Sequence, residues 1–219
     1  FEEGLGVPQS YVRAFDWYNM AANKGNADAQ EALATLYLEG QGVKEDQNAA
    51  LMWYRKAIGN GSVRAEERLA NLYYIGRAVV QDYAAAAKWY RAAAEHGSAK
   101  AQERLGAMYR LGRGVPRENF AEAIAWYTKS ADAGNGDAQL ALGEMYRQGQ
   151  GVEKNNATAR KWFALAADQG VAAAEAILWQ MFDEGTFPVD EAFEWNKRMA
   201  ERGSARSQRT LGNMYATGK

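Results

Sequence analysis

Residues 101–134 read AQERLGAMYRLGRGVPRENFAEAIAWYTKSADAG, and the same pattern recurs along the whole chain of 219 residues. Its tryptophan returns at steps of 36, 36, 37, 36 and 33 residues, at Trp17, Trp53, Trp89, Trp126, Trp162 and Trp195. A fixed period of this length is the signature of stacked supersecondary units. We therefore predict a repeat protein of about six units, each about 36 residues long.

Each unit contains two helical patterns. Residues 50–58 place apolar side chains at i, i+3, i+4, i+7 and i+8, which form one face of a helix. A second helical pattern follows the glycine and serine at 97–98, where glycine can end one helix and Ser98 can cap the next. Glycine pairs such as Gly112 and Gly114 then form a loop that tolerates positive φ. No strand-like alternation persists, so we predict an all-helical fold of antiparallel helix pairs.

Insertions are confined to one loop, because the last glycine of each unit always follows its tryptophan by 23 residues. Units that touch only their neighbours form one continuous core, so we predict a single domain over residues 1–219. Both ends cut a repeat: Phe1 falls where an aromatic residue of a unit is expected, and Lys219 comes just after Tyr215 and Gly218. We interpret the chain as a fragment of a longer array.

Composition removes several functional classes. The 26 Lys and Arg residues nearly balance the 27 Asp and Glu residues, so no overall field favours nucleic acid or an anionic membrane. Without cysteine and with a single histidine, the chain has no disulfide framework, no Cys-His dyad and no multi-histidine metal site. No apolar run of about 18 residues could span a bilayer. No cofactor is expected.

The repeated frame resembles that of a known family. Its clearest copy has the residues Ala101, Leu105, Gly106, Tyr109, Gly112, Gly114, Val115, Ala123, Trp126, Tyr127, Ala131 and Gly134. This frame is similar to the Sel-one-like repeat, a relative of the tetratricopeptide repeat, and the resemblance covers nearly the whole chain. The resemblance implies a right-handed superhelical solenoid in which the Leu-Gly-x-x-Tyr helices line a concave face. It also implies an adaptor that holds other proteins, and it slightly favours an exported or periplasmic bacterial protein over a cytoplasmic one.

The fifth copy departs from this frame. The residue after the leucine is small in the other copies, as at Gly106 and Gly143, but is Trp179 here. A large side chain at a close helix contact overpacks a regular stack by about 1–3 kcal/mol unless the helices separate. We therefore predict that the superhelix changes its pitch between residues 175 and 195.

The residues offer little for catalysis. His96 lies at a predicted helix C-terminus, where a surface position is more plausible than a general base near Ser98. The neighbouring acids Glu66 and Glu67 point about 100° apart on a helix, which favours a solvated face over the carboxylate pair of a glycosidase. The same holds for the pair at residues 190–191. The recurring tryptophans are interpreted as core.

The surface that remains is the predicted groove. The positions two before, two after, and five and six after each repeat leucine should face it, and the candidate partner-binding residues are Leu38, Glu39, Glu67, Asn71, Tyr74, Ile75, Glu103, Arg110, Leu111, Glu144 and Arg147. Leu38, Tyr74, Ile75 and Leu111 would form an apolar strip, which indicates either a partner or the sealing of neighbouring helix ends.

We therefore predict a non-enzymatic scaffold that binds a protein or peptide in its groove, with no nucleic-acid partner and no membrane insertion. Two alternatives stay open: a carboxylate-dependent hydrolase acting in the groove, and a purely structural spacer. Self-association through the cut ends is also possible, because Leu211 and Tyr215 have no following helix to cover them.

Overall fold

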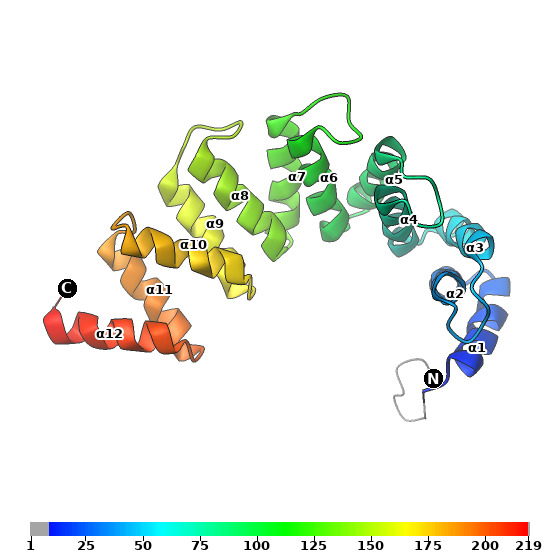
Figure 1. The fold of residues 1–219 in the computed structure, drawn as a ribbon, viewed down its shortest axis with the longest axis horizontal. Helices are drawn as coiled ribbons and strands as arrows, with labels where there is room; N and C mark the ends of the chain where they lie inside the picture. The colour runs from blue at the N-terminus through cyan, green and yellow to red at the C-terminus, as the bar shows by residue number, and fades with distance from the viewer. Residues whose placement is uncertain (1–8, 219) are drawn as a thin grey trace. The chain divides into compact units, whose positions relative to one another are not determined.

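The computed structural model describes residues 9–218, which form twelve α-helices (Figure 1). The helices are α1 (Tyr11–Asn23), α2 (Ala27–Glu39), α3 (Gln47–Gly59), α4 (Val63–Ile75), α5 (Tyr83–Glu95), α6 (Ala99–Leu111), α7 (Phe120–Asp132), α8 (Gly136–Gln148), α9 (Asn156–Asp168), α10 (Ala172–Asp183), α11 (Val189–Glu201) and α12 (Ala205–Thr217). No strand occurs in the described part of the chain. The predicted all-helical fold of about six helix pairs is confirmed.

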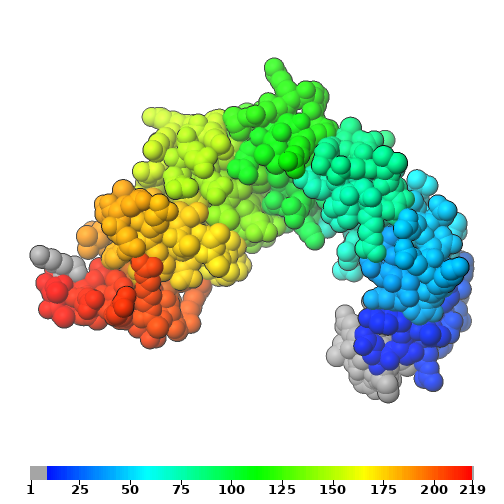
Figure 2. Space-filling view, in the orientation of Figure 1, coloured from blue at the N-terminus to red at the C-terminus, as the bar shows by residue number. Residues whose placement is uncertain are grey.

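The helices belong to two compact units, residues 1–129 and residues 130–219. In the first unit α1 packs against α2, α2 against α3, α4 against α5 and α5 against α6. In the second, α8 packs against α9, α9 against α10 and α11 against α12. The space-filling view shows successive helix pairs of the first unit, coloured from blue through cyan, in direct contact (Figure 2). Within each unit, these packed helices are neighbours in the chain, as a repeat array requires.

The second helix of most pairs begins at a capping side chain. Ser62 and Ser98 each accept a hydrogen bond from the backbone N–H three residues on, and Asn26, Asn135 and Ser204 occupy the equivalent position in other repeats. Such caps satisfy N–H groups that have no partner within the helix. The predicted cap at Ser98 is confirmed. In the fifth repeat Val171 stands at this position and provides no side-chain cap.

The second glycine of the Gly-x-Gly loop has a packing role as well as a conformational one. Gly114 has φ +68°, and a Cβ there would collide with the backbone carbonyl of Tyr83 at the start of α5. Gly42 lies in the same way against Tyr11 at the start of α1. The loop thus packs against the first helix of its own helix pair. Glycine is required there because the two backbones approach too closely for a Cβ atom. The second repeat has Ala78 instead, with φ +62°.

Aromatic and aliphatic side chains form the core of each unit. In the first unit the buried cluster includes Leu33, Trp53, Tyr54 and Leu69. In the second it includes Phe163, Leu178, Trp179 and Trp195. The leucines and the residues around the repeat tryptophans therefore meet between helices, as the helical spacing predicts.

The prediction that all six recurring tryptophans are core holds only in part. Trp53, Trp126 and Trp195 are buried, whereas Trp89 and Trp162 are half-buried. Trp17 is 58% exposed, so the prediction is wrong there. Trp17 lies on α1, the first helix of the described residues, and no described helix precedes α1 to cover it.

Trp179 fits its core through an exchange of side-chain volume. In the preceding repeats a glycine faces the aromatic residue after the tryptophan: a Cβ on Gly106 would lie 2.8 Å from the ring of Tyr127, and Gly143 is covered by Phe163. Around Trp179 that next aromatic position is held by Asn196, which is fully buried. The Trp179 ring packs against Trp195 instead, with centroids 4.8 Å apart. A large residue and a small one have changed places, while the change of pitch stays a prediction.

Candidate binding face

The candidate residues of the first unit lie on α2, α4 and α6, the second helices of their pairs. On α4, Arg64, Arg68, Asn71 and Ile75 follow at i, i+4, i+7 and i+11, so they form one stripe along the helix. On α6 the stripe formed by Lys100, Arg104, Ala107 and Leu111 occupies the equivalent positions, 36 residues later. We call these two stripes, with the adjoining side of α2, the binding face.

Each stripe changes from basic to apolar along its helix. The side chains of Arg64, Arg68 and Arg104 are 71%, 55% and 49% exposed. At the other end, Ile75 and Leu111 are 51% and 50% exposed. Two neighbouring helices thus present cations at their N-terminal ends and large apolar side chains at their C-terminal ends, all reachable from solvent.

The predicted apolar strip is shorter than expected. Leu38 is only 5% exposed and belongs to the core of the first unit, so the prediction of an accessible Leu38 is wrong. Tyr74 is half-buried, and its ring packs edge-on against Tyr83 and Tyr90 at centroid distances of 5.2 and 6.5 Å. Its hydroxyl accepts a hydrogen bond of 3.2 Å from Arg113. Leu38 and Tyr74 therefore support the fold, and Ile75 and Leu111 remain as the exposed pair.

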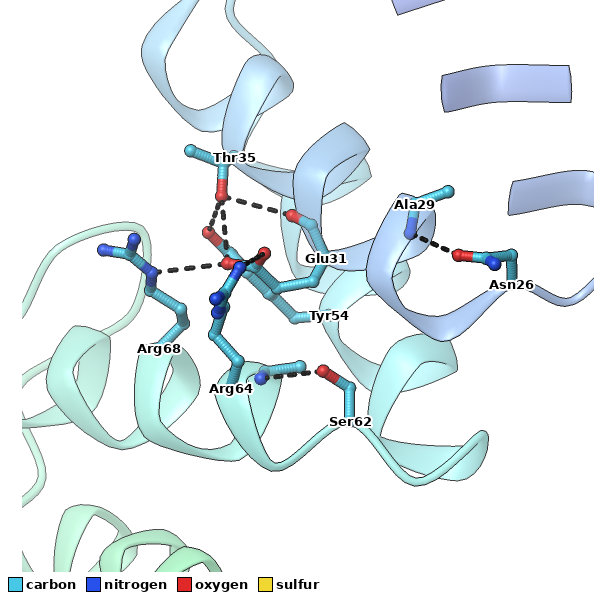
Figure 3. A network of polar contacts seen from close by, with 9 residues as sticks. Asn26, Ala29, Glu31, Thr35, Tyr54, Ser62, Arg64 and Arg68 are labelled. Atoms are coloured by element: carbon cyan, nitrogen blue, oxygen red, sulfur yellow. Dashed lines mark hydrogen bonds and ion pairs between the residues drawn. The ribbon is translucent and has the colours of Figure 1, made fainter. Parts of the chain in front are cut away.

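A buried carboxylate organises the N-terminal side of the binding face (Figure 3). Glu31 is 5% exposed, and its Oε1 accepts a hydrogen bond from Arg68 Nε at 3.4 Å. Arg64 lies 3.9 Å from its other oxygen. Burial raises the pKa of Glu31, although the two guanidinium groups partly oppose this effect. Glu31 thus holds the arginines of the next repeat in place.

The same site contains a hydroxyl pair. Thr35 Oγ1 lies 3.0 Å from the hydroxyl of Tyr54 and donates to the backbone carbonyl of Glu31 at 3.1 Å (Figure 3). Burial is the main cause of a raised pKa at Tyr54. Glu31, Thr35, Arg64 and Arg68 line a hollow of about 610 Å³, which we call the Glu31 hollow; the exposed Trp17 forms part of its wall.

A second hollow of about 500 Å³ lies between α4 and α6. It is lined by Arg64, Glu67, Arg68, Asn71, Tyr90, Lys100 and Arg104, and we call it the basic hollow. Four of these seven side chains are cationic and one is acidic. Lys100 has no ion-pair partner among residues 9–218, and Arg68 and Arg104 are contacted by carboxylates at their Nε atoms, at 3.4 Å in each case. The site is suited to an anion.

The remaining charged candidates of the first unit are paired. Glu39 forms a two-pronged ion pair with Arg77, with N–O distances of 2.9 and 3.1 Å. Glu67 accepts a hydrogen bond of 2.5 Å from Ser98, and Glu103 lies 3.4 Å from Arg104 Nε. Arg110 is half-buried. These contacts leave Asn71 as the exposed neutral donor among the candidates of this unit.

His96 joins adjacent repeats. It caps α5 with its side chain 60% exposed, and its Nδ1 lies 2.9 Å from Glu66 Oε2. The predicted surface position of His96 is confirmed, but the predicted solvated face is wrong for Glu66, which is 6% exposed. The preceding repeat has an equivalent contact: Gln30 stands at the position of Glu66 and accepts a hydrogen bond of 2.8 Å from Asn60, which stands at the position of His96. Hydrogen bonding to Glu66, and then its charge, raise the pKa of His96.

In the second unit, Glu144 and Arg147 lie on α8 and are half-buried. The Nε of Arg147 is buried and forms no hydrogen bond with any described residue. A polar site that the sequence reasoning missed lies nearby in the chain: the guanidinium of Arg160 binds both carboxylate oxygens of Glu191, at 2.9 and 3.3 Å. Arg160 occupies the position of Leu51 in an earlier repeat. A charged residue at a position that is apolar in that repeat is the sequence feature that indicates this ion pair.

A comparison with protein-family models matches the Sel1 repeat to residues 1–26, 27–62, 63–98, 99–135 and 136–171. The chain belongs to the Sel1 repeat family. Each of these windows ends between the first and the second helix of one of the pairs described above, as at residue 62 between α3 and α4, so the family repeat is offset by one helix from those pairs. A search of curated proteins found no match.

Two solved Sel1 repeat structures are similar along the whole chain. One is a protective antigen of uropathogenic Escherichia coli strains with an SLR fold, at 36% identity and a TM-score of 0.81; all of this chain aligns with 47% of the antigen. The other is a Sel1 repeat protein from Oxalobacter formigenes, at 30% identity and a TM-score of 0.79, of which 84% is covered. The chain thus spans about half the length of the antigen.

The Sel1 repeat structure places few chemically reactive groups together. Among residues 9–218, no three His, Cys, Asp or Glu side chains gather as metal ligands. Ser98 caps α6 and donates to Glu67, and His96 binds Glu66; among residues 9–218 no hydrogen bond joins His96 to Ser98. No helix of the described chain is long and apolar enough to cross a membrane.

Proposed function

We propose that this chain is a non-enzymatic scaffold that binds a protein or peptide on the binding face of its first unit. Sel1 repeat proteins are in general repeat scaffolds that mediate protein–protein interactions. The proposal for this chain rests on one observation: α4 and α6 present matching exposed stripes, basic at one end and apolar at the other.

Exposure of these stripes is not needed for stacking. The core contacts of α4 are made by Leu69 and Leu72, which are buried, whereas Ile75 is half-exposed. Large apolar side chains at equivalent exposed positions of neighbouring repeats favour a partner, because partner anchors are typically apolar residues surrounded by charged ones. A helix or an extended peptide could cross both stripes.

The test compares two double variants in a pull-down from extract of the source cells. Ile75→Glu with Leu111→Glu places charges on the binding face. Met52→Glu with Leu165→Glu makes the same chemical change at side chains that are 44% and 46% exposed on α3 and α9, the first helices of their pairs. We expect a protein retained by the parent and by the control to be lost from the first variant.

Circular dichroism should show that both variants fold. Retention of the same proteins by both variants would contradict the proposal and favour a different surface. Capture of nothing specific by the folded parent would favour the spacer interpretation.

A further inference from the structure

The basic hollow has a composition that the stacking of repeats does not explain. Arg64, Arg68, Lys100 and Arg104 approach it from α4 and α6, and Asn71 adds an amide. Like charges gathered on neighbouring helices repel each other unless an anion lies between them. Glu67, the acid in the lining, already accepts a hydrogen bond from Ser98.

The arginines are held in a way that leaves donors available. Arg68 Nε donates to Glu31, and the other two nitrogens of this guanidinium donate to no group among residues 9–218. Arg104 is likewise contacted at Nε, by Glu103. A carboxylate binds a guanidinium best through two parallel N–H bonds. Because Arg68 and Arg104 are held at Nε, their terminal guanidinium nitrogens remain available for such bonds.

Tyr90 supplies a second, independent observation. It lines the basic hollow, is 3% exposed, and its hydroxyl forms no hydrogen bond within the described chain. In the preceding repeat the equivalent Tyr54 hydroxyl pairs with Thr35 at 3.0 Å. The residue equivalent to Thr35 is Asn71, and it does not pair with Tyr90. The hydroxyl of a buried side chain that lines a hollow and has no protein partner is available to donate a hydrogen bond to a ligand there.

Burial raises the pKa of Tyr90 to about 12, so the hydroxyl remains a donor at neutral pH. Arginine, lysine, amide and phenol groups in the basic hollow thus all offer hydrogens, which is the arrangement that recognises a carboxylate.

We infer that the basic hollow binds an acidic peptide segment of a partner protein, with at least two carboxylates placed among Arg68, Lys100, Arg104 and the Tyr90 hydroxyl. This inference rests on the proposed function and names the chemistry of its partner. The half-exposed Ile75 and Leu111 further along the same stripes would receive an apolar side chain of the same segment.

The charges around the hollow favour a peptide over a nucleic acid. Glu31, Glu67 and Glu103 lie on α2, α4 and α6, beside the cations of α4 and α6. A continuous phosphate backbone would be repelled by these acids, and the chain as a whole carries a formal charge of −1. A short acidic segment can place its carboxylates at the cations alone.

The test is an NMR titration of the isotopically labelled chain with a tetraglutamate peptide whose ends are acetylated and amidated. A tetraglutamine peptide of the same length is the reference. We expect saturable shifts at the Asn71 amide, the Tyr90 ring and the arginine Nε–H groups, with affinity at least about tenfold above that for tetraglutamine. Added salt should weaken the binding.

Two variants locate the site. Lys100→Gln with Arg104→Gln should weaken tetraglutamate binding about tenfold or more. Lys44→Gln with Arg117→Gln removes the same charge from exposed loop residues outside the hollow, and should change the affinity less than about twofold. Circular dichroism and unchanged spectra of remote residues verify folding of both.

Several outcomes would overturn the inference: equal binding of tetraglutamine, equal losses in both variants, or shifts centred on Lys197, Arg198 and Arg209 of the last two helices. Tighter binding of a thymidine oligonucleotide at the same residues would assign the hollow to nucleic acid instead. If the partner captured through Ile75 and Leu111 is not displaced by tetraglutamate, the inference fails while the proposed function stands.

Discussion

Tyr54 and Tyr90 form a natural matched pair, and removing each hydroxyl should have different effects on stability. Both side chains are buried, at 1% and 3% exposure, and both lie at the same position of neighbouring repeats. The Tyr54 hydroxyl pairs with Thr35 Oγ1 at 3.0 Å, whereas the Tyr90 hydroxyl has no partner among the described residues. Replacement by Phe keeps the ring and removes only the polar atom.

The structure gives the expected size of each effect. Tyr54→Phe removes one buried hydrogen bond, and Thr35 keeps its 3.1 Å bond to the Glu31 carbonyl, so the loss should be about 1 kcal/mol. Tyr90→Phe removes a hydroxyl that contributes no bond in the free protein, so the change should stay within about 0.5 kcal/mol.

Urea unfolding followed by circular dichroism measures both variants, and an unchanged dependence on urea concentration would show that the comparison is valid. The same Tyr90→Phe protein should bind tetraglutamate more weakly than the parent does. A loss of stability as large for Tyr90→Phe as for Tyr54→Phe would refute the reasoning, because it would mean that the Tyr90 hydroxyl already has a partner in the free protein.

Three further predictions concern the stacking of the repeats. Trp126→Ala should cost about 3–5 kcal/mol through the cavity it leaves, while Trp17→Ala, at an exposed side chain, should cost less than about 1 kcal/mol; equal urea midpoints would contradict this. Gly143→Ala should destabilise by about 1–3 kcal/mol because its Cβ meets the Phe163 ring, whereas Gly212→Ala has open space and should stabilise by about 0.5–1 kcal/mol; thermal unfolding should therefore shift in opposite directions. Because Glu66 raises the folded-state pKa of His96, this pair should stabilise fully below the unfolded pKa of 6.5 and lose its effect as pH rises through the folded pKa. His96→Gln should remove the contribution of the His96–Glu66 pair from the pH dependence of the urea midpoint. An unchanged pH profile in this variant would show that the pair makes no such contribution.

The sequence predicts the architecture well because each repeat uses the same local rules. Glycine period, helical spacing and the serine cap all indicate helix pairs, and the structure forms these pairs with Ser98 as a cap. Local rules do not reveal what covers a residue in the folded chain. Trp17 has the motif of its buried equivalents yet is exposed, because the cover comes from another repeat.

The candidate site was less predictable for the same reason. Leu38 and Ile75 come from neighbouring positions of the frame, yet one is in the core and the other is half-exposed. The Glu31 network depends on arginines 33 and 37 residues away, so no local pattern could indicate that its carboxylate is buried. A difference between neighbouring repeats carries the missing information: Asn71 stands at the position of Thr35, and the Tyr90 hydroxyl has no partner equivalent to the one that Tyr54 finds in Thr35.

Site-specific photo-crosslinking would test the central claim most directly. A photoreactive amino acid at Asn71 lies in the basic hollow, and the same amino acid at Met52 lies on α3 outside both hollows. In extract of the source cells, a binding face on α4 and α6 predicts a defined protein adduct from position 71 that excess tetraglutamate suppresses, and no such adduct from position 52. The same adduct from both positions, or one from position 52 alone, would contradict the account.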